Sequence, residues 1–157
     1  MENDSTKNVT FFRFEDLRIY HKSLDYIDWV YNATILFPDE HSRDLKSRFI
    51  AASQAISLYI AEGSARNKSQ FVYYLKMAKS SVRECVVFTS VAEKQNYMTE
   101  SMIEESRNQL MEMTKMLGAL IGSLQRTNGS YNKPNKREEA VNGNEYTPSE
   151  PIEVRNY

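Results

Sequence analysis

The chain has 157 residues and a mass of 18.3 kDa, enough for one domain with one hydrophobic core. Its 20 basic and 21 acidic residues give a net charge of −1, which excludes the strong overall positive charge typical of nucleic-acid-binding domains. A single cysteine excludes a disulfide scaffold and predicts a reducing compartment, and 5 glycines and 4 prolines are too few for the turns of an all-β sandwich.

The N-terminal segment, residues 1–12, is polar apart from the aromatic pair at its end and is predicted to be flexible. It contains no apolar segment of the kind that a secretory signal needs. No stretch of the chain approaches the roughly 18 consecutive apolar residues of a membrane span. We therefore expect a soluble cytoplasmic protein.

Residues 13–125 are predicted to fold into four helices, over 14–36, 40–64, 69–95 and 100–125. In each segment apolar residues recur at steps of three and four, which places them in one stripe along a helix. In the first segment the stripe predicted to face the core consists of Phe14, Leu17, Tyr20, Leu24, Ile27, Tyr31 and Thr34. Short connections make successive helices antiparallel, so the predicted fold is all-α, an up-down-up-down four-helix bundle.

Helix-terminating and helix-capping residues support these boundaries. Pro38 forces the residue before it out of the helical region and ends the first helix. Gly63 is predicted to end the second helix in a left-handed conformation. Asn67 or Ser69 caps the start of the third helix, and Thr99 caps the fourth.

The last segment, residues 126–157, is rich in Asn, Pro, Gly, Glu and Lys and has few apolar residues. Such a composition buries too little surface to offset the entropy of ordering, so we predict a disordered polar tail. The chain is thus divided into a flexible N-terminus, one bundle domain and this tail.

The chain carries no motif of a known catalytic class: it lacks a G-x-S-x-G elbow, a P-loop and a dinucleotide-binding turn. The two histidines, His21 and His41, are too few for a metal cluster. Cys85 falls within the apolar stripe of the third helix, where a buried and unreactive thiol is expected. We therefore expect no enzymatic activity, no metal and no cofactor.

A basic stripe on the third helix is the main charged feature, since residues 68–94 carry five basic and two acidic side chains. With two cations of the second helix it is predicted to form a candidate face for nucleic acid or a partner, consisting of Arg43, Lys46, Lys68, Lys76, Lys79 and Arg83. The alternatives are a solvated helix surface, or salt bridges to the acidic fourth helix of a neighbouring copy.

Aromatic residues exceed what one bundle core buries. Tyr26, Trp29 and Tyr73 fall outside the predicted stripes, and large aromatics at the edge of a core are enriched at interfaces. These three residues are the candidate oligomer interface. Glu62 and Arg66, four residues apart near the end of the second helix, are expected to form an ion pair.

Several short motifs occur in a fixed order along the predicted helices. Phe-Glu-Asp-Leu opens the first at 14–17, Phe-Pro follows at 37–38, and Ile-Ala-Glu-Gly closes the second at 60–63, before Arg66. This set resembles the bacterial four-helix bundle family of the 23S rRNA intervening-sequence proteins, related to the accessory variability determinant of diversity-generating retroelements. The motif residues expected to have structural roles are Phe14, Asp16, Leu17, Phe37, Pro38, Ala61, Glu62, Gly63 and Arg66.

The resemblance implies a homopentamer of bundles around a central channel. It also implies RNA or DNA and a reverse-transcriptase-type protein as partners, because the retroelement relatives bind nucleic acid and associate with a reverse transcriptase. The chain departs from the family pattern at Ala51 and Tyr59, where the family has Arg and Asn. We expect a non-enzymatic homo-oligomeric scaffold or adaptor that contacts structured nucleic acid or such a partner. The alternative is a pure protein–protein interaction module without nucleic-acid binding.

Overall fold

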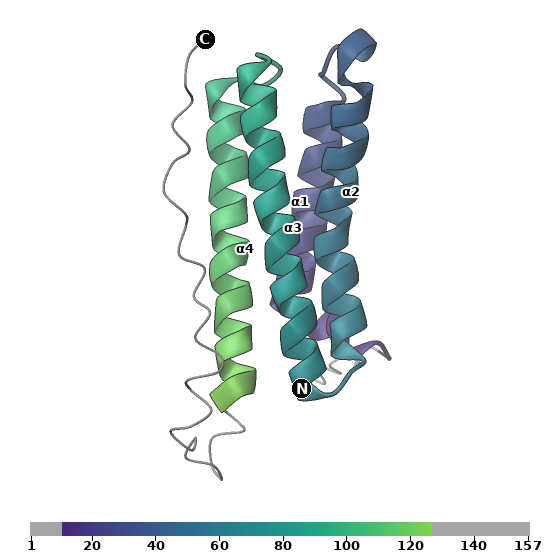
Figure 1. Ribbon diagram of the computed structural model, residues 1–157, viewed down its shortest axis with the longest axis vertical. Coiled ribbons are helices and arrows are strands. Elements are labelled where there is room, and N and C mark those ends of the chain that lie inside the picture. The colour runs from purple at the N-terminus through teal and green to yellow at the C-terminus, as the bar shows by residue number, and fades with distance from the viewer. Residues whose placement is uncertain (1–10, 127–157) are drawn as a thin grey trace, which may run out of the picture.

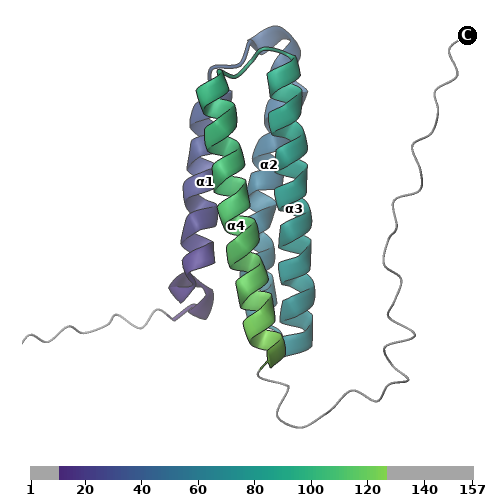
Figure 2. The same cartoon turned by 90° about the vertical axis from the view of Figure 1, so that its left-hand side faces the viewer.

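Four long helices form the described part of the chain, residues 11–126, in the computed structural model (Figure 1). They are α1 (Arg18–Thr34), α2 (Asp39–Ser64), α3 (Lys68–Lys94) and α4 (Glu100–Arg126), and the 3-10 turn η1 (Arg13–Asp16) precedes them. Each helix runs antiparallel to the one before it, and α4 lies beside α1, which closes the bundle (Figure 2). Residues 11–126 contain no strand, and the predicted all-α up-down-up-down bundle is confirmed.

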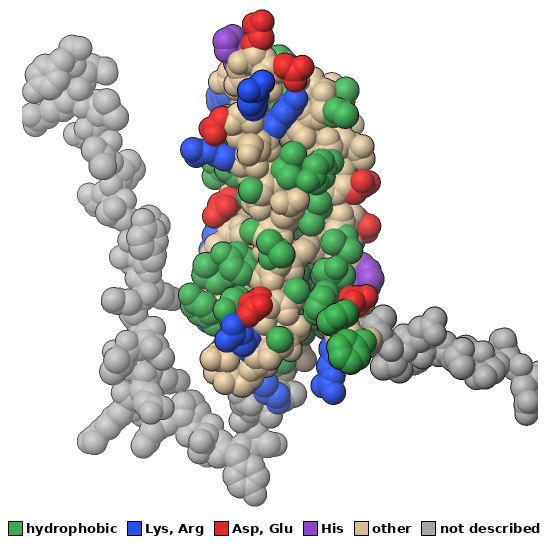
Figure 3. Space-filling view, turned by 90° about the vertical axis from the view of Figure 1, so that its right-hand side faces the viewer, with side chains coloured by type: hydrophobic (Ala, Val, Ile, Leu, Met, Phe, Trp, Pro, Cys, Tyr) green, Lys and Arg blue, Asp and Glu red, His purple; other side chains and the backbone are tan. Residues whose placement is uncertain are grey.

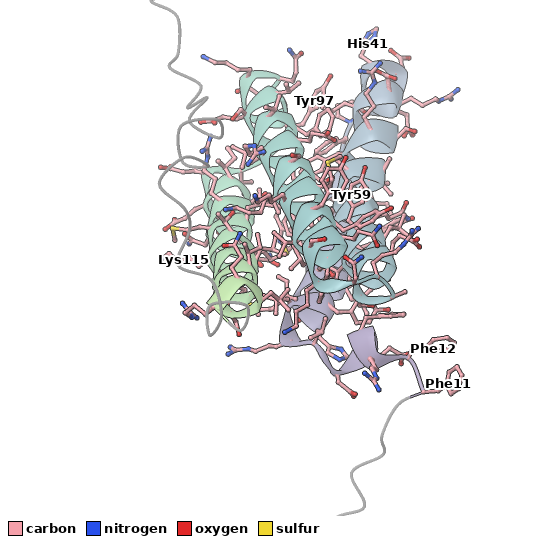
Figure 4. The ribbon with its side chains drawn as sticks, turned by 60° about the horizontal axis from the view of Figure 1, so that its bottom comes forward. Phe11, Phe12, His41, Tyr59, Tyr97 and Lys115 are labelled. Atoms are coloured by element: carbon pink, nitrogen blue, oxygen red, sulfur yellow. The ribbon has the colours of Figure 1, made fainter. Side chains whose placement is uncertain are left out.

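The two predicted terminal segments lie almost wholly outside the described residues. Of the N-terminal segment only Phe11 and Phe12 are described, and both are exposed at the end of the bundle that carries η1 (Figure 4). Of the predicted tail only Arg126 is described, as the last residue of α4.

The predicted caps of the last two helices are confirmed. The Asn67 side-chain oxygen accepts a hydrogen bond from the backbone N–H of Gln70 at 3.0 Å, at the start of α3. Thr99 Oγ1 accepts one from the backbone N–H of Met102 at 3.2 Å, at the start of α4. Each bond satisfies a backbone donor that has no partner inside the helix.

Two predicted helix ends are wrong. The first helix begins at Arg18, because Leu17 is extended (φ −79°, ψ 125°) and separates α1 from η1. Gly63 lies inside α2 without a positive φ, so it is not a left-handed terminator. A Cβ at Gly63 would lie 2.6 Å from Cβ of Tyr74 and 2.9 Å from Cδ2 of Phe71. Glycine is needed there because α3 passes too close to α2 for a side chain.

The core-facing stripe of α1 also differs from the prediction. The buried residues of α1 are Ile19, Ser23, Tyr26, Val30, Ala33 and Thr34. Of the predicted stripe only Thr34 is buried, whereas Leu24 and Tyr31 are 39% and 48% exposed. In the other helices the apolar residues that recur at steps of three and four do supply core residues, among them Val82 and Leu117. The helix α1 therefore carries two apolar stripes, and the second remains at the surface.

Small polar side chains complete the buried stripe of α1. Ser23 Oγ lies 2.6 Å from Ser57 Oγ, in a hydrogen bond that joins α1 to α2. Tyr26 Oη and Thr89 Oγ1 each lie 2.8 Å from Ser106 Oγ, so one hydroxyl cluster joins α1, α3 and α4. Every buried side-chain N or O atom of the described residues has a hydrogen-bond partner. These polar residues therefore stay in the core without the cost of an unsatisfied group.

Candidate interaction surfaces

The surface stripe of α1 forms one wall of an open groove of about 500 Å³. The groove, called here the α1/α2 groove, is lined by Phe14, Tyr20, Leu24, Ile27, Gln54, Ser57, Leu58 and Ala61. Leu24 on one wall is 39% exposed and Leu58 on the other is 66% exposed. Ile35, which follows the last residue of α1 and does not line the groove, is 77% exposed. The bundle core is already complete, so nothing among the described residues covers this groove.

Exposed acidic residues lie on the solvent-facing side of α1. Asp25 and Asp28 are exposed residues of α1. Asp28 accepts a long hydrogen bond of 3.4 Å from the Asn32 side chain, and Asp25 has no ion-pair partner among the described residues. Figure 3 shows hydrophobic side chains over α1 and α2, with acidic side chains along the edge that α1 forms. Helical spacing places Asp28 beside the exposed stripe of Leu24, whereas Asp25 lies on the side of α1 where Lys22 pairs with Glu112 of α4 at 3.0 Å.

A second apolar surface lies on the side of α3 that faces solvent, called here the α3 outer face. It consists of Tyr73, Val87 and Val91, which are 60%, 59% and 38% exposed, together with the adjacent Lys76, Lys79 and Arg83. Lys76 and Lys79 form no ion pair with a described residue, and Arg83 donates a 3.0 Å hydrogen bond to Ser80 Oγ. This face is therefore apolar with positive charges that are not neutralised within the bundle.

The residues of the predicted basic face shared by α2 and α3 are spread along the length of the bundle. Phe49 of α2 packs against Phe88 of α3, with ring centroids 5.8 Å apart. Arg43 lies beyond Phe49 toward one end, while Lys76 lies toward the other, roughly 25 Å apart at 1.5 Å per helical residue. Lys46, at the Arg43 end, also pairs with Asp39 at 3.1 Å, and Lys68 begins α3 at the opposite end. Only the α3 part of the predicted face remains together.

A hollow of about 490 Å³ opens between α2 and α3. Ala51 and Tyr59, two positions at which the resemblance led us to expect a departure from the family pattern, both line it, beside Glu84 and Arg48. The Arg48 guanidinium is 3.2 Å from the Asp44 carboxylate, so it is turned to a partner on its own helix. Tyr59 lies between the two helices (Figure 4). Ser81 and Glu84 both line the hollow, but no hydrogen bond joins them, and we assign the hollow no chemistry.

The predicted pair at the end of α2 is confirmed. Arg66 Nη2 lies 2.5 Å from Glu62 Oε1, and the guanidinium carbon is 5.6 Å from the centroid of the Tyr74 ring on α3. The hydrogen bonds that Arg66 donates to the Glu62 carboxylate, and next its electrostatic interaction with Tyr74, raise the pKa of Arg66. These contacts stabilise the turn between α2 and α3, so Glu62 and Arg66 have a structural role.

Of the three predicted interface aromatics, only Tyr73 is exposed. The assignment of Tyr26 is wrong, because Tyr26 is fully buried and hydrogen-bonded to Ser106 inside the bundle. Trp29 is half-buried and stacks on Tyr26, with ring centroids 5.8 Å apart. The sequence pattern placed Leu24 in the core-facing stripe, because its helical spacing is also that of core residues, and it did not single out Leu58.

The predicted burial of Cys85 is confirmed, and burial is also the main cause that raises the pKa of its thiol. His21 contacts the backbone oxygen of Glu15 through Nε2. Within residues 11–126 no three His, Cys, Asp or Glu side chains lie close enough to hold a metal ion. No helix of the described residues is long and apolar enough to cross a membrane.

The fold and these surfaces define a helical-bundle protein whose candidate sites are interaction surfaces. The chain belongs to the 23S rRNA-intervening sequence protein family, whose family model matches residues 15–119. Its fold is similar to that of a protein of unknown function from the S23 ribosomal protein family of Bacteroides thetaiotaomicron. That likeness has a TM-score of 0.61 at 19% identity and covers 66% of this chain and 95% of the other. No curated protein matches the chain.

Proposed function

We propose that this protein is a self-associating helical scaffold without catalytic activity of its own. The observation that supports this function is the α1/α2 groove, which leaves large apolar side chains in water beside a complete core. Contiguous apolar surface of this kind marks an interaction site on soluble proteins. The family resemblance implies five copies, which corresponds to about 92 kDa, five times the 18.3 kDa of one chain.

The test is the solution mass of the full chain, measured by light scattering on a sizing column over a range of concentrations. We expect an oligomer for the native chain and its loss in Leu24→Asp and Leu58→Asp, which place a charge in the groove. Leu36→Asp is the matched control, because Leu36 is 70% exposed and does not line the groove. A native chain that stays near 18.3 kDa at every concentration would contradict the proposal.

Nucleic-acid binding is the second candidate function. The observation that favours it is the row of cations on the α3 outer face, where Lys76 and Lys79 have no ion pair with a described residue. Structured RNA should then bind with an affinity that falls steeply with salt. The double change Lys76→Glu and Arg83→Glu should abolish retention, and Lys115→Glu on α4 should not. Absence of salt-sensitive binding would instead favour a protein-interaction module, whose partner, on the resemblance, is a reverse-transcriptase-type protein.

A further inference from the structure

Acidic residues are concentrated in the last part of the chain, outside the described residues. Between positions 138 and 154 there is no Lys, Arg or His, and five residues are glutamates, at 138, 139, 145, 150 and 153. Residues 150–154, Glu-Pro-Ile-Glu-Val, combine two of these carboxylates with three apolar side chains. We call residues 150–154 the acidic segment. Such a segment fits a surface that carries both exposed apolar side chains and unpaired cations.

The α3 outer face is a surface of this kind. Helical spacing puts Tyr73, Lys76, Arg83 and Val87 on one side of α3. Tyr73 and Val87 are 60% and 59% exposed. Lys76 has no ion pair with a described residue, and Arg83 donates a hydrogen bond only to the neutral Ser80 hydroxyl. The face therefore offers apolar contact and two positive charges that no described carboxylate neutralises.

The spacing of the charges also matches. Pro151 favours the polyproline II conformation, in which residues three apart, such as Glu150 and Glu153, lie on the same side and ~9 Å apart. Lys76 and Arg83 are seven residues apart in α3, which places them ~10 Å apart along the helix axis. The two glutamates can therefore meet the two cations at the same time.

The α1/α2 groove fits the acidic segment less well. None of the residues that line the groove is Lys or Arg, so it offers no ion pair to a glutamate. Asp28 lies beside the exposed stripe of Leu24, and like charges in a contact are repulsive. The acidic segment should therefore prefer the α3 outer face.

The tail is long enough to bring the acidic segment there. The helix α4 ends at Arg126, at the end of the bundle where α3 begins (Figure 2). Residues 127–149 separate Arg126 from the acidic segment and can span up to ~75 Å. The 27 residues of α3 cover only ~40 Å, so the whole α3 outer face is within reach. Because both surfaces belong to one chain, the effective concentration is high and a contact of modest strength suffices.

We propose that the acidic segment docks on the α3 outer face of its own chain, with Glu150 and Glu153 opposite Lys76 and Arg83. Ile152 then lies against the exposed apolar side chains of the face. The contact goes beyond the proposed function, since it forms within one chain and needs neither self-association nor nucleic acid. Nucleic acid could reach Lys76 and Arg83 only by displacing the segment, so the tail would compete with the second candidate function.

Cross-linking within the full chain tests this contact. Ile152→Cys is combined either with Val87→Cys, on the α3 outer face, or with the matched control Leu58→Cys, in the α1/α2 groove. Cysteine is itself apolar, and Cys85 does not interfere because it is buried. Each rate with a short bismaleimide is corrected for the reactivity of the two cysteines with a monomaleimide. We expect the pair with Val87→Cys to link about tenfold faster, and this advantage to vanish in about 1 M salt.

Three outcomes of the cross-linking would overturn the docking. Equal rates for the two pairs would show that the segment has no preference for the α3 outer face. A faster pair with Leu58→Cys would place the segment in the α1/α2 groove. Links between two chains in place of links within one, distinguished by their mass on a denaturing gel, would show that the segment binds another copy.

A charge exchange supplies the second test, in the variant that carries Ile152→Cys and Val87→Cys. Lys76→Glu with Arg83→Glu, and separately Glu150→Lys with Glu153→Lys, should each slow the cross-linking about tenfold, because each removes two ion pairs. Combining all four changes restores opposite charges and should restore the rate. Lys115→Glu is the control, since Lys115 lies on α4, outside the α3 outer face (Figure 4). A quadruple variant slower than both double variants would overturn the docking.

The failure of this docking and the failure of the proposed function give different results. A native chain that is monomeric at every concentration removes self-association, whereas the preferential link within one chain remains and supports the docking. A native oligomer without that preferential link keeps the scaffold and overturns the docking.

Discussion

Replacing Gly63 by alanine tests the close approach of α2 and α3. The added carbon would lie 2.6 Å from Tyr74 Cβ and 2.9 Å from Phe71 Cδ2, against 3.4 Å for ordinary contact. The Phe71 ring can rotate away, but Tyr74 Cβ is fixed to the backbone. The backbone of α3 must therefore retreat by about 0.8 Å, the difference between 3.4 and 2.6 Å. This shift opens the most extensive helix–helix contact of the bundle.

Two opposing effects set the change in the free energy of unfolding that Gly63→Ala should cause. Overpacking a close contact costs ~1–3 kcal/mol, and alanine recovers ~0.5–1 kcal/mol in helix propensity. We expect a net loss of about 1–2 kcal/mol in the free energy of unfolding. Urea denaturation followed by far-ultraviolet circular dichroism measures it, and with a slope of ~1–3 kcal/mol per molar urea the midpoint should fall by roughly 1 M.

Gly118→Ala is the matched control for Gly63→Ala. Gly118 also lies within a helix, α4, and a Cβ there would meet nothing within 4 Å. It should therefore show only the propensity gain, a stabilisation of ~0.5–1 kcal/mol. If Gly63→Ala proved as stabilising as Gly118→Ala, the close packing of α2 on α3 at Gly63 would be refuted.

Three further changes test the turn and the core. Asn96 has a φ of 58° in the turn between α3 and α4, so Asn96→Gly should keep or raise the urea midpoint, and Asn96→Ala should lower stability by ~1 kcal/mol. Tyr26→Phe removes the hydroxyl bonded to Ser106 and should cost ~1 kcal/mol by the same measurement; an unchanged midpoint would contradict that bond. Burial raises the pKa of the Cys85 thiol and of the Tyr26 hydroxyl, so only the unfolded state ionises as the pH rises past their ordinary values. Stability should fall by ~1.4 kcal/mol per pH unit above about pH 8.5 because of Cys85, and by as much again above about pH 10 because of Tyr26, so Cys85→Ala should remove the part of the fall that begins near pH 8.5. Thiol labelling that proceeded faster than unfolding would contradict the burial of Cys85.

The helices of this protein could be predicted from sequence because their signals are local. The three-and-four spacing of apolar residues indicates a helix within one or two turns of the backbone. The residues that mark the helix ends, Pro38, Asn67 and Thr99, also act over this short range. The ion pair between Glu62 and Arg66 follows from the same local geometry. The candidate site was harder to predict, because it depends on which stripes the bundle leaves uncovered.

The sequence by itself determined the number, approximate limits and antiparallel order of the helices, since these follow from helical periodicity and short connections. Only the tertiary structure decided which stripe of α1 is buried. Both stripes have helical spacing, but the buried one contains Ser23 and Tyr26, whose hydroxyls find Ser57 and Ser106 on other helices. A polar residue is stable in a core only when its partner is in place, and that partner can lie 34 or 80 residues away in the chain. The burial of this stripe left Leu24 and its neighbours at the surface, where they form the α1/α2 groove.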